Sequence, residues 1–88
     1  MDDSKLIEIL KNEGFTNIFI HSDPPNAYYD DHTHSKITAH IVLKGEITLN
    51  LESISTTYKP YSRFDVPAGQ VHSANIGNDG CTYIIGEK

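Results

Sequence analysis

Three of the five histidines in this sequence have a residue type and spacing suited to holding a metal ion. His32 and His34 are two residues apart, so in an extended segment both imidazoles project from the same face, about 6–7 Å apart along the strand. His72 follows a Pro-Ala-Gly turn at 67–69 and begins another β-rich run. A neutral imidazole binds first-row transition metals through one ring nitrogen. Two solvent-facing histidines at a strand end would show the same spacing, so the pair alone does not define a site.

A short amphipathic helix is predicted at the N-terminus. Its apolar residues are spaced three and four apart and so share one side of a helix: Leu6, Ile7, Ile9 and Leu10. Gly14 stands where such a helix ends. We therefore assign residues 1–14 to an N-terminal helix and residues 15–88 to a β-domain.

The rest of the chain is rich in β-branched and aromatic residues that form short runs separated by turn residues. Seven strands are predicted: Thr16–Ser22, Ile37–Leu43, Glu46–Leu51, Ile54–Tyr58, Arg63–Val66, Val71–Asn75 and Thr82–Ile85. The turn signals include Lys44-Gly45 and the Gly-Asn-Asp-Gly sequence at 77–80. Many short, evenly spaced strands indicate an all-β sandwich or barrel.

The predicted strand Ile37–Leu43 is apolar on both faces. Because side chains alternate along a strand, Ile37 and Ile41 share one face while His40 and Val42 share the other. Each face must therefore be covered by something. The inside of a barrel would cover one face, and the N-terminal helix or a second subunit would cover the other. We predict a homodimer on this basis.

The composition limits the class of protein. The chain has 88 residues, which supports one domain, and its net charge is 7 − 12 = −5 with neutral histidines. An acidic chain without a Lys/Arg run is not expected to bind nucleic acid. The single cysteine, Cys81, excludes an internal disulfide and a thiolate cage. The acidic N-terminus and the absence of a long apolar run predict a cytoplasmic protein that does not enter membranes.

The histidines stand in a pattern that resembles the two motifs of the cupin superfamily, G-x5-H-x-H-x3,4-E-x6-G and, from its proline onward, P-x-G-x2-H. The first motif maps onto Asn26, His32, His34, Thr38 and Gly45, and the second onto Pro67, Gly69 and His72. The matched region covers more than half of the chain. The resemblance implies a small single-domain cupin of the RmlC-like type, a jelly-roll β-barrel over residues 1–88 with its N-terminal helix. It also implies that the motif histidines surround one divalent transition metal ion, with Fe, Ni, Zn and Mn not distinguished.

Three positions depart from the cupin motifs. Thr38 stands where the first motif carries a glutamate, normally the fourth protein ligand. Asn26 and Tyr61 replace the glycines that lead the two motifs. Asparagine tolerates a left-handed backbone, whereas an aromatic residue there is unexpected. The backbone near Tyr61 is therefore expected to differ from that of other cupins.

The missing glutamate leaves two interpretations of the site. Either His32, His34 and His72 hold a divalent ion that keeps its full charge and open positions, or the metal function has decayed. His40 shares the inward face with Thr38 and is a candidate fourth ligand. It could equally donate a hydrogen bond behind the ligands or be a neutral core histidine.

Three classes of function remain open. The first is a metal-dependent enzyme of oxygenase or isomerase type acting on a small molecule. The second is a non-catalytic module that binds or senses a metal or small molecule, and the third is a cupin fold kept for assembly alone. Tyr28, Tyr29 and His40 are candidate substrate-binding residues, although burial of aromatic rings in a small core is the alternative for the tyrosines. No sequence pattern identifies a catalytic residue.

Overall fold

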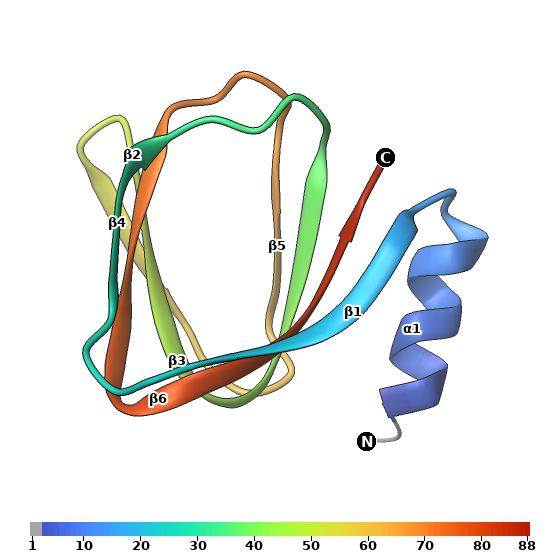
Figure 1. The fold of residues 1–88 in the computed structure, drawn as a ribbon, viewed down its shortest axis with the longest axis horizontal. Helices are drawn as coiled ribbons and strands as arrows, with labels where there is room; N and C mark the ends of the chain where they lie inside the picture. The colour runs from blue at the N-terminus through green and yellow to red at the C-terminus, as the bar shows by residue number, and fades with distance from the viewer. Residues whose placement is uncertain (1–2) are drawn as a thin grey trace.

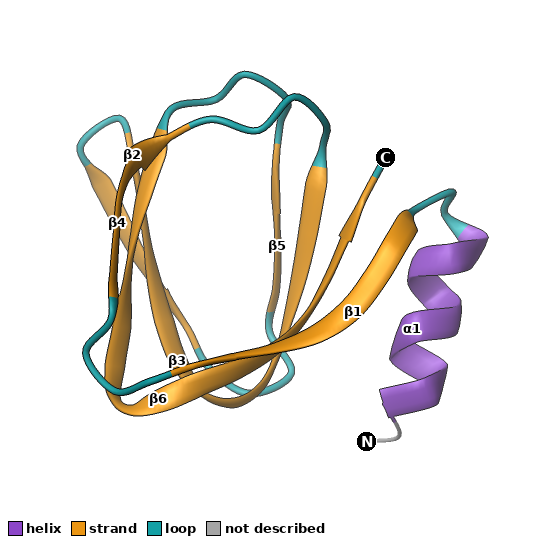
Figure 2. Cartoon of the chain, in the orientation of Figure 1, coloured by secondary structure: helices purple, strands orange, loops and turns teal. Residues whose placement is uncertain are grey.

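Strand β6 (His72–Glu87) organises this fold, because it pairs with three other strands, β1, β2 and β3, all antiparallel. The structure, a computed structural model, describes residues 3–88. The strands curl into a barrel with a single helix packed on the outside (Figures 1 and 2). The predicted all-β barrel with an N-terminal helix is confirmed.

Six strands and the helix make up the described chain. In order they are α1 (Asp3–Asn12), β1 (Thr16–Asp23), β2 (Tyr28–His32), β3 (Thr38–Leu51), β4 (Ile54–Tyr58), β5 (Arg63–Val66) and β6. The main path across the sheet is β1-β6-β3-β4, with β2 paired to β6 and β5 paired to β3. Residues 1 and 2 of the predicted helical segment lie outside the described residues.

Two long strands replace four of the predicted short ones. The predicted turns at 44–45 and 77–80 are bends within β3 and β6, which run side by side through both. Gly45 has φ 72° and Gly80 has φ 80°, and a Cβ on Gly45 would lie 1.9 Å from the Gly80 carbonyl oxygen. These glycines therefore let the paired strands turn the corner of the barrel together. The prediction of separate strands was wrong here, because a glycine at a barrel corner and a glycine in a hairpin look alike in sequence.

Strand β2 was not predicted, because its sequence Tyr-Tyr-Asp-Asp-His lacks apolar alternation. The tight turn between β3 and β4 is formed by Glu52 and Ser53, both with positive φ (46° and 72°). Two such residues in succession are typical of a type I′ turn, which usually takes Asn-Gly.

Helix α1 covers the outer face of β3. Leu6 and Leu10 are buried on the helix and pack in one cluster with Ala39, Ile41 and Ile84. The second face of the same strand points into the barrel, where Val42 lies in the interior core. Both faces are thus covered, as predicted. The sequence left open whether the N-terminal helix or a second subunit covers the outer face of this strand. In the structure the helix covers it.

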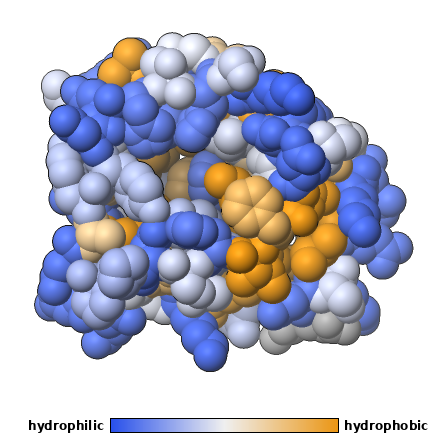
Figure 3. Space-filling view, in the orientation of Figure 1, coloured by the Kyte–Doolittle hydropathy of each residue, from blue (hydrophilic) through white to orange (hydrophobic). Residues whose placement is uncertain are grey.

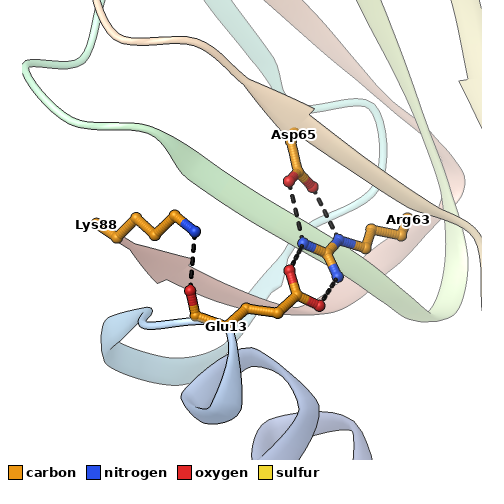
Figure 4. Close-up of polar contacts among 4 residues, drawn as sticks. All are labelled: Glu13, Arg63, Asp65 and Lys88. Carbon is orange, nitrogen blue, oxygen red and sulfur yellow. Dashed lines mark hydrogen bonds and ion pairs between the residues drawn. The ribbon is translucent and has the colours of Figure 1, made fainter.

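A polar cluster fastens the end of the helix to the sheet (Figure 4). Arg63 Nη1 and Nη2 donate to the two Glu13 carboxylate oxygens at 2.8 and 2.7 Å. The same guanidinium donates to both oxygens of Asp65 at 2.9 and 3.0 Å. Lys88 Nζ donates to the Glu13 backbone carbonyl at 2.8 Å. Arg63 and Lys88 also lie over the Phe15 ring, 5.7 and 4.8 Å from its centroid.

The two residues that replace motif glycines keep the glycine-like backbone. Asn26 has φ 61° and Tyr61 has φ 70°. The Tyr61 amide donates to the Val42 carbonyl at 2.7 Å, which ties its turn to β3. Tyr61 therefore adopts the left-handed conformation that favours glycine although it carries an aromatic ring, and a difference from the backbone of other cupins stays a prediction.

Among residues 3–88, no helix has the length and apolar character needed to span a membrane.

Candidate metal centre

The three motif histidines come together at one end of the barrel interior. His32 ends β2 and pairs in register with His72 at the start of β6, and His34 lies in the loop that follows β2. The ring centroids lie 4.2 Å apart for His32 and His72 and 5.0 Å apart for each of the other two pairs. One nitrogen from each ring lies within 4.8 Å of the others, so together they could hold a metal ion.

Backbone carbonyls fix the orientation of two of these rings. Nδ1 of His32 lies 2.6 Å from the Asp30 carbonyl oxygen, and Nδ1 of His72 lies 2.9 Å from the Gln70 carbonyl oxygen. A carbonyl only accepts, so each Nδ1 carries the hydrogen and donates it. In the neutral rings Nε2 is then left with its lone pair free, which is the arrangement found in metal-ligating histidines.

His34 is held in the neutral form by its surroundings. Its partial burial lowers the pKa of the ring, and the neighbouring His72 and His32 lower it further. A neutral ring has the free lone pair that coordination requires. The three rings lie so close together that protonating all of them is unfavourable. The same closeness favours one metal ion shared by the three rings.

The donor set fits a first-row divalent metal. Two nitrogens bound to one ion at about 2.1 Å each lie at most about 4.2 Å apart, so shifts of less than about 1 Å would bring all three rings onto one ion. Three imidazoles supply no negative charge, and a set of three leaves further coordination positions open.

The histidines open into a cavity of about 280 Å³ in the barrel. Apolar and aromatic side chains form most of its wall, including Phe19, Leu49, Phe64 and Ile85. Figure 3 shows the surface hollowed over the middle of the barrel, with apolar side chains gathered beside it over β1 and the end of β6. The volume corresponds to roughly nine water molecules, so the cavity suits a small ligand.

His40 lies in the wall of this cavity but outside the group of converging ligand atoms. Its ring stacks on Phe64, with centroids 4.4 Å apart and planes 8° apart, and lies 5.7 Å from the Tyr83 ring. Burial, then the nearby His34, lowers the pKa of His40 to about 4. Its Nδ1 is buried and makes no hydrogen bond. His40 is therefore a neutral ring with an unpartnered nitrogen beside the cavity.

A second polar cluster, which the sequence did not indicate, lies in the same barrel. The Asp23 carboxylate at the end of β1 accepts hydrogen bonds from the hydroxyls of Tyr83 (2.8 Å) and Tyr29. His21 Nε2 lies 2.9 Å from the same carboxylate. Burial and the hydrogen bond to Asp23 raise the pKa of both tyrosines. The three donors line the cavity, and we call these four residues the Asp23 cluster.

The remaining predicted residues are placed as follows. Tyr28 and Tyr29 were both predicted as candidate substrate-binding residues. Tyr29 lines the cavity, whereas Tyr28 is 58% exposed and is not part of the lining. Thr38 is buried, and its hydroxyl makes no hydrogen bond. Cys81 is a buried free thiol with a pKa raised to about 11, first by burial and then by Asp23.

One sequence signal could have found the Asp23 cluster. Phe19, His21 and Asp23 alternate along β1 and therefore share a face. The apolar residues Ile18 and Ile20 lie on the other face of β1.

No protein-family model and no curated protein sequence matches the chain. Solved structures do match. A cupin superfamily protein from Desulfitobacterium hafniense aligns with TM-score 0.72 and 17% identity over 80% of this chain and 63% of its own. The DMSP lyase DddQ from Ruegeria pomeroyi aligns with TM-score 0.73 and 18% identity over 81% of this chain and 36% of its own. KdgF from Halomonas sp. aligns with TM-score 0.68 and 18% identity over 80% of this chain and 67% of its own.

The chain thus spans less than two thirds of the first two of these proteins. At such identities the similarity concerns the path of the backbone, which agrees with the motif pattern around the histidines. This chain has the fold of a small cupin domain.

Proposed function

We propose that this protein holds one divalent transition metal ion through His32, His34 and His72 and binds a small molecule at that ion inside the barrel. The observation that carries the proposal is the convergence of three ring nitrogens within 4.8 Å at the end of a partly open, mostly apolar cavity. The backbone carbonyls that receive Nδ1–H from His32 and His72 support it, because they leave Nε2 free.

The chemistry follows from the ligand set. When bound, such an ion supplies a Lewis acid with positions that the protein does not fill. The apolar wall excludes water around a bound ligand and so strengthens polar contacts there. A reaction of oxygenase or isomerase type is the finer hypothesis. That similar folds include a DMSP lyase and KdgF supports small-molecule chemistry in a barrel of this shape.

A non-catalytic module that binds a small molecule is the alternative, and the cavity supports it equally. Metal content does not separate the two, because both need the ion. Turnover of candidate small acids and thiols by the metal-loaded protein would establish the enzyme, and saturable binding without turnover would establish the module.

Metal analysis of the untagged protein tests the shared part of the proposal. We expect about one ion per chain, and His72→Ala should remove most of it because two imidazoles hold a divalent ion far less tightly than three. His21→Ala is the matched control, since His21 lies in the same cavity outside the ligand group. Full metal occupancy in His72→Ala, or equal loss in both variants, would exclude this site.

A further inference from the structure

The Asp23 cluster places a buried carboxylate behind the cavity wall with no arginine or lysine to balance it. The Asp23 side chain is 4% exposed. Within residues 3–88, the arginine ion pairs join Arg63 to Glu13 and Asp65, and His21 is the only basic side chain paired with Asp23. The carboxylate is instead stabilised by two phenol hydroxyls and one imidazole N–H.

These hydrogen bonds decide what the wall can offer a ligand. A phenol has one hydrogen, and Tyr29 and Tyr83 both give theirs to Asp23. Their oxygens can therefore only accept a hydrogen bond from a cavity ligand. His21 likewise donates Nε2–H to Asp23, which leaves its Nδ1 as an acceptor in the neutral ring. This wall therefore presents to a ligand hydrogen-bond acceptors, aromatic ring faces and the electrostatic field of one carboxylate.

The unpartnered Nδ1 of His40 is an independent sign that the cavity receives a polar group. His40 is buried, lines the cavity and lies next to Tyr83. A buried polar atom without a partner is costly unless a ligand or water satisfies it. His40 thus lines the same cavity as Tyr83 and the three histidines of the proposed metal centre.

We infer that the Asp23 cluster binds a protonated amine of a small ligand whose other end faces the three-histidine centre. An ammonium group donates hydrogen bonds, carries a positive charge that would balance the Asp23 carboxylate, and is attracted by aromatic faces such as those of Tyr29 and Tyr83, which line the cavity. The span suits one molecule, because the Tyr29 ring lies 6.3 Å from the His32 ring in a cavity of about 280 Å³. The placement of the ligand's other end at the three-histidine centre rests on the proposed function. The amine site at the Asp23 cluster does not rest on it.

The test uses metal-stripped protein at pH 8, where alkylamines are protonated. Three probes of equal size, n-butylammonium, n-butanol and butyrate, are titrated while amide chemical shifts are followed by NMR. We expect the ammonium to bind about tenfold more tightly than the alcohol, and butyrate to bind most weakly. Asp23→Asn should bring the ammonium-to-alcohol ratio close to one, because the charge is lost while the shape is kept.

The ratio separates recognition from damage to the fold, since a distorted cavity weakens all three probes together. Tyr28→Phe is the control, because Tyr28 lies outside the cavity lining and should leave the ratio unchanged. If Asp23→Asn does not fold, Tyr29→Phe, which removes one acceptor from the wall, should lower the ratio instead. Equal binding of alcohol and ammonium, stronger binding of butyrate, or an unchanged ratio in a folded Asp23→Asn protein would overturn the inference. The probe titrations are made without metal. Their outcome is therefore independent of the metal analysis of His72→Ala, which tests the proposed function.

Discussion

At the scale of single residues, Thr38 is the unusual member of the proposed centre. It stands at the glutamate position of the cupin motif, is buried, and carries a hydroxyl with no hydrogen bond. A neutral hydroxyl is a weak ligand for a divalent ion and cannot offset its charge. His40 offers the competing explanation, because a fourth imidazole would fill the position that the glutamate vacates.

Two variants distinguish an open three-histidine centre from a closed four-histidine one. In the open centre, Thr38→Glu should retain metal more tightly and bind azide less well, because one open position and one positive charge are lost together. In that case His40→Ala should keep most of its metal. The measurements are metal affinity and azide binding to the cobalt-substituted protein by visible absorption. Unchanged azide binding in Thr38→Glu, together with metal loss in His40→Ala equal to that in His34→Ala, would establish the closed centre.

At the scale of turns and strands, sequence patterns predicted conformation better than they predicted where an element ends. The glycines at 45 and 80 were predicted to lie in turns between separate strands, but the packing of β3 against β6 shows that both strands continue through them. The histidine cluster was predictable because its spacing matches a motif. The Asp23 cluster was only partly predictable. Alternation along β1 places His21 and Asp23 on one face, but Tyr29 and Tyr83 come from β2 and β6 and reach Asp23 only through the curl of the barrel.

Tyr61 provides a test of backbone strain in one turn. Its φ of 70° costs a residue with a Cβ about 1 kcal/mol relative to glycine. Since its side chain is half exposed, Tyr61→Gly should raise the free energy of unfolding by up to about 1 kcal/mol. Tyr61→Ala is the matched control, because it removes the same ring but keeps the Cβ. Chemical denaturation measures both, and equal stability of the two variants would show that the turn carries no such strain.

The contact between Glu13 and Arg63 predicts how the docking of α1 depends on pH. The hydrogen bonds and charge of Arg63 lower the pKa of Glu13 below its ordinary value of 4.5. A carboxyl with a lower pKa in the folded state contributes stability above its unfolded pKa, and that contribution is lost as pH falls through the folded value. The melting temperature should therefore fall on acidification below about pH 4.5, and Arg63→Ala should reduce this dependence while lowering the melting temperature at pH 7.

Arg63→Lys is the control for charge without geometry, since lysine cannot hold two carboxylates through a planar fork. The melting temperature of Arg63→Lys and its pH dependence should lie between those of the wild type and of Arg63→Ala. Identical pH profiles for all three proteins would show that the cluster in Figure 4 does not anchor the helix.

At the scale of the whole molecule, the homodimer stays a prediction. Its original basis was the apolar outer face of the strand that contains Ile41, which α1 covers in the structure. Sedimentation velocity at micromolar concentration tests it, and a monomer would mean that the helix alone completes this face.

The covered face also predicts a difference between two substitutions. Ile41→Asp buries a charge between α1 and the sheet and should cost more than about 4 kcal/mol, enough to undock the helix or unfold the domain. Thr48→Asp lies on β3 at a half-buried position and should change stability far less. Thermal melting followed by circular dichroism compares them. Equal loss in both variants would contradict the packing described for Ile41.

The position of β6 in the chain has a consequence for how the barrel folds. Strands β1, β2 and β3 all find a partner in β6, which follows the other described strands in the sequence. Without β6, β1 and β2 lack the strand that forms their hydrogen bonds, because β2 pairs with the start of β6 and β1 with its end. Folding must then join residues that are far apart in sequence, as in the pairing of His32 with His72 or of Thr16 with Glu87, so it is dominated by contacts between distant parts of the chain. Such topologies fold slowly and expose unpaired strand edges meanwhile. A chain in which β6 has not yet paired therefore has an incomplete barrel, and His32 and His72 come together only when β6 pairs with β2.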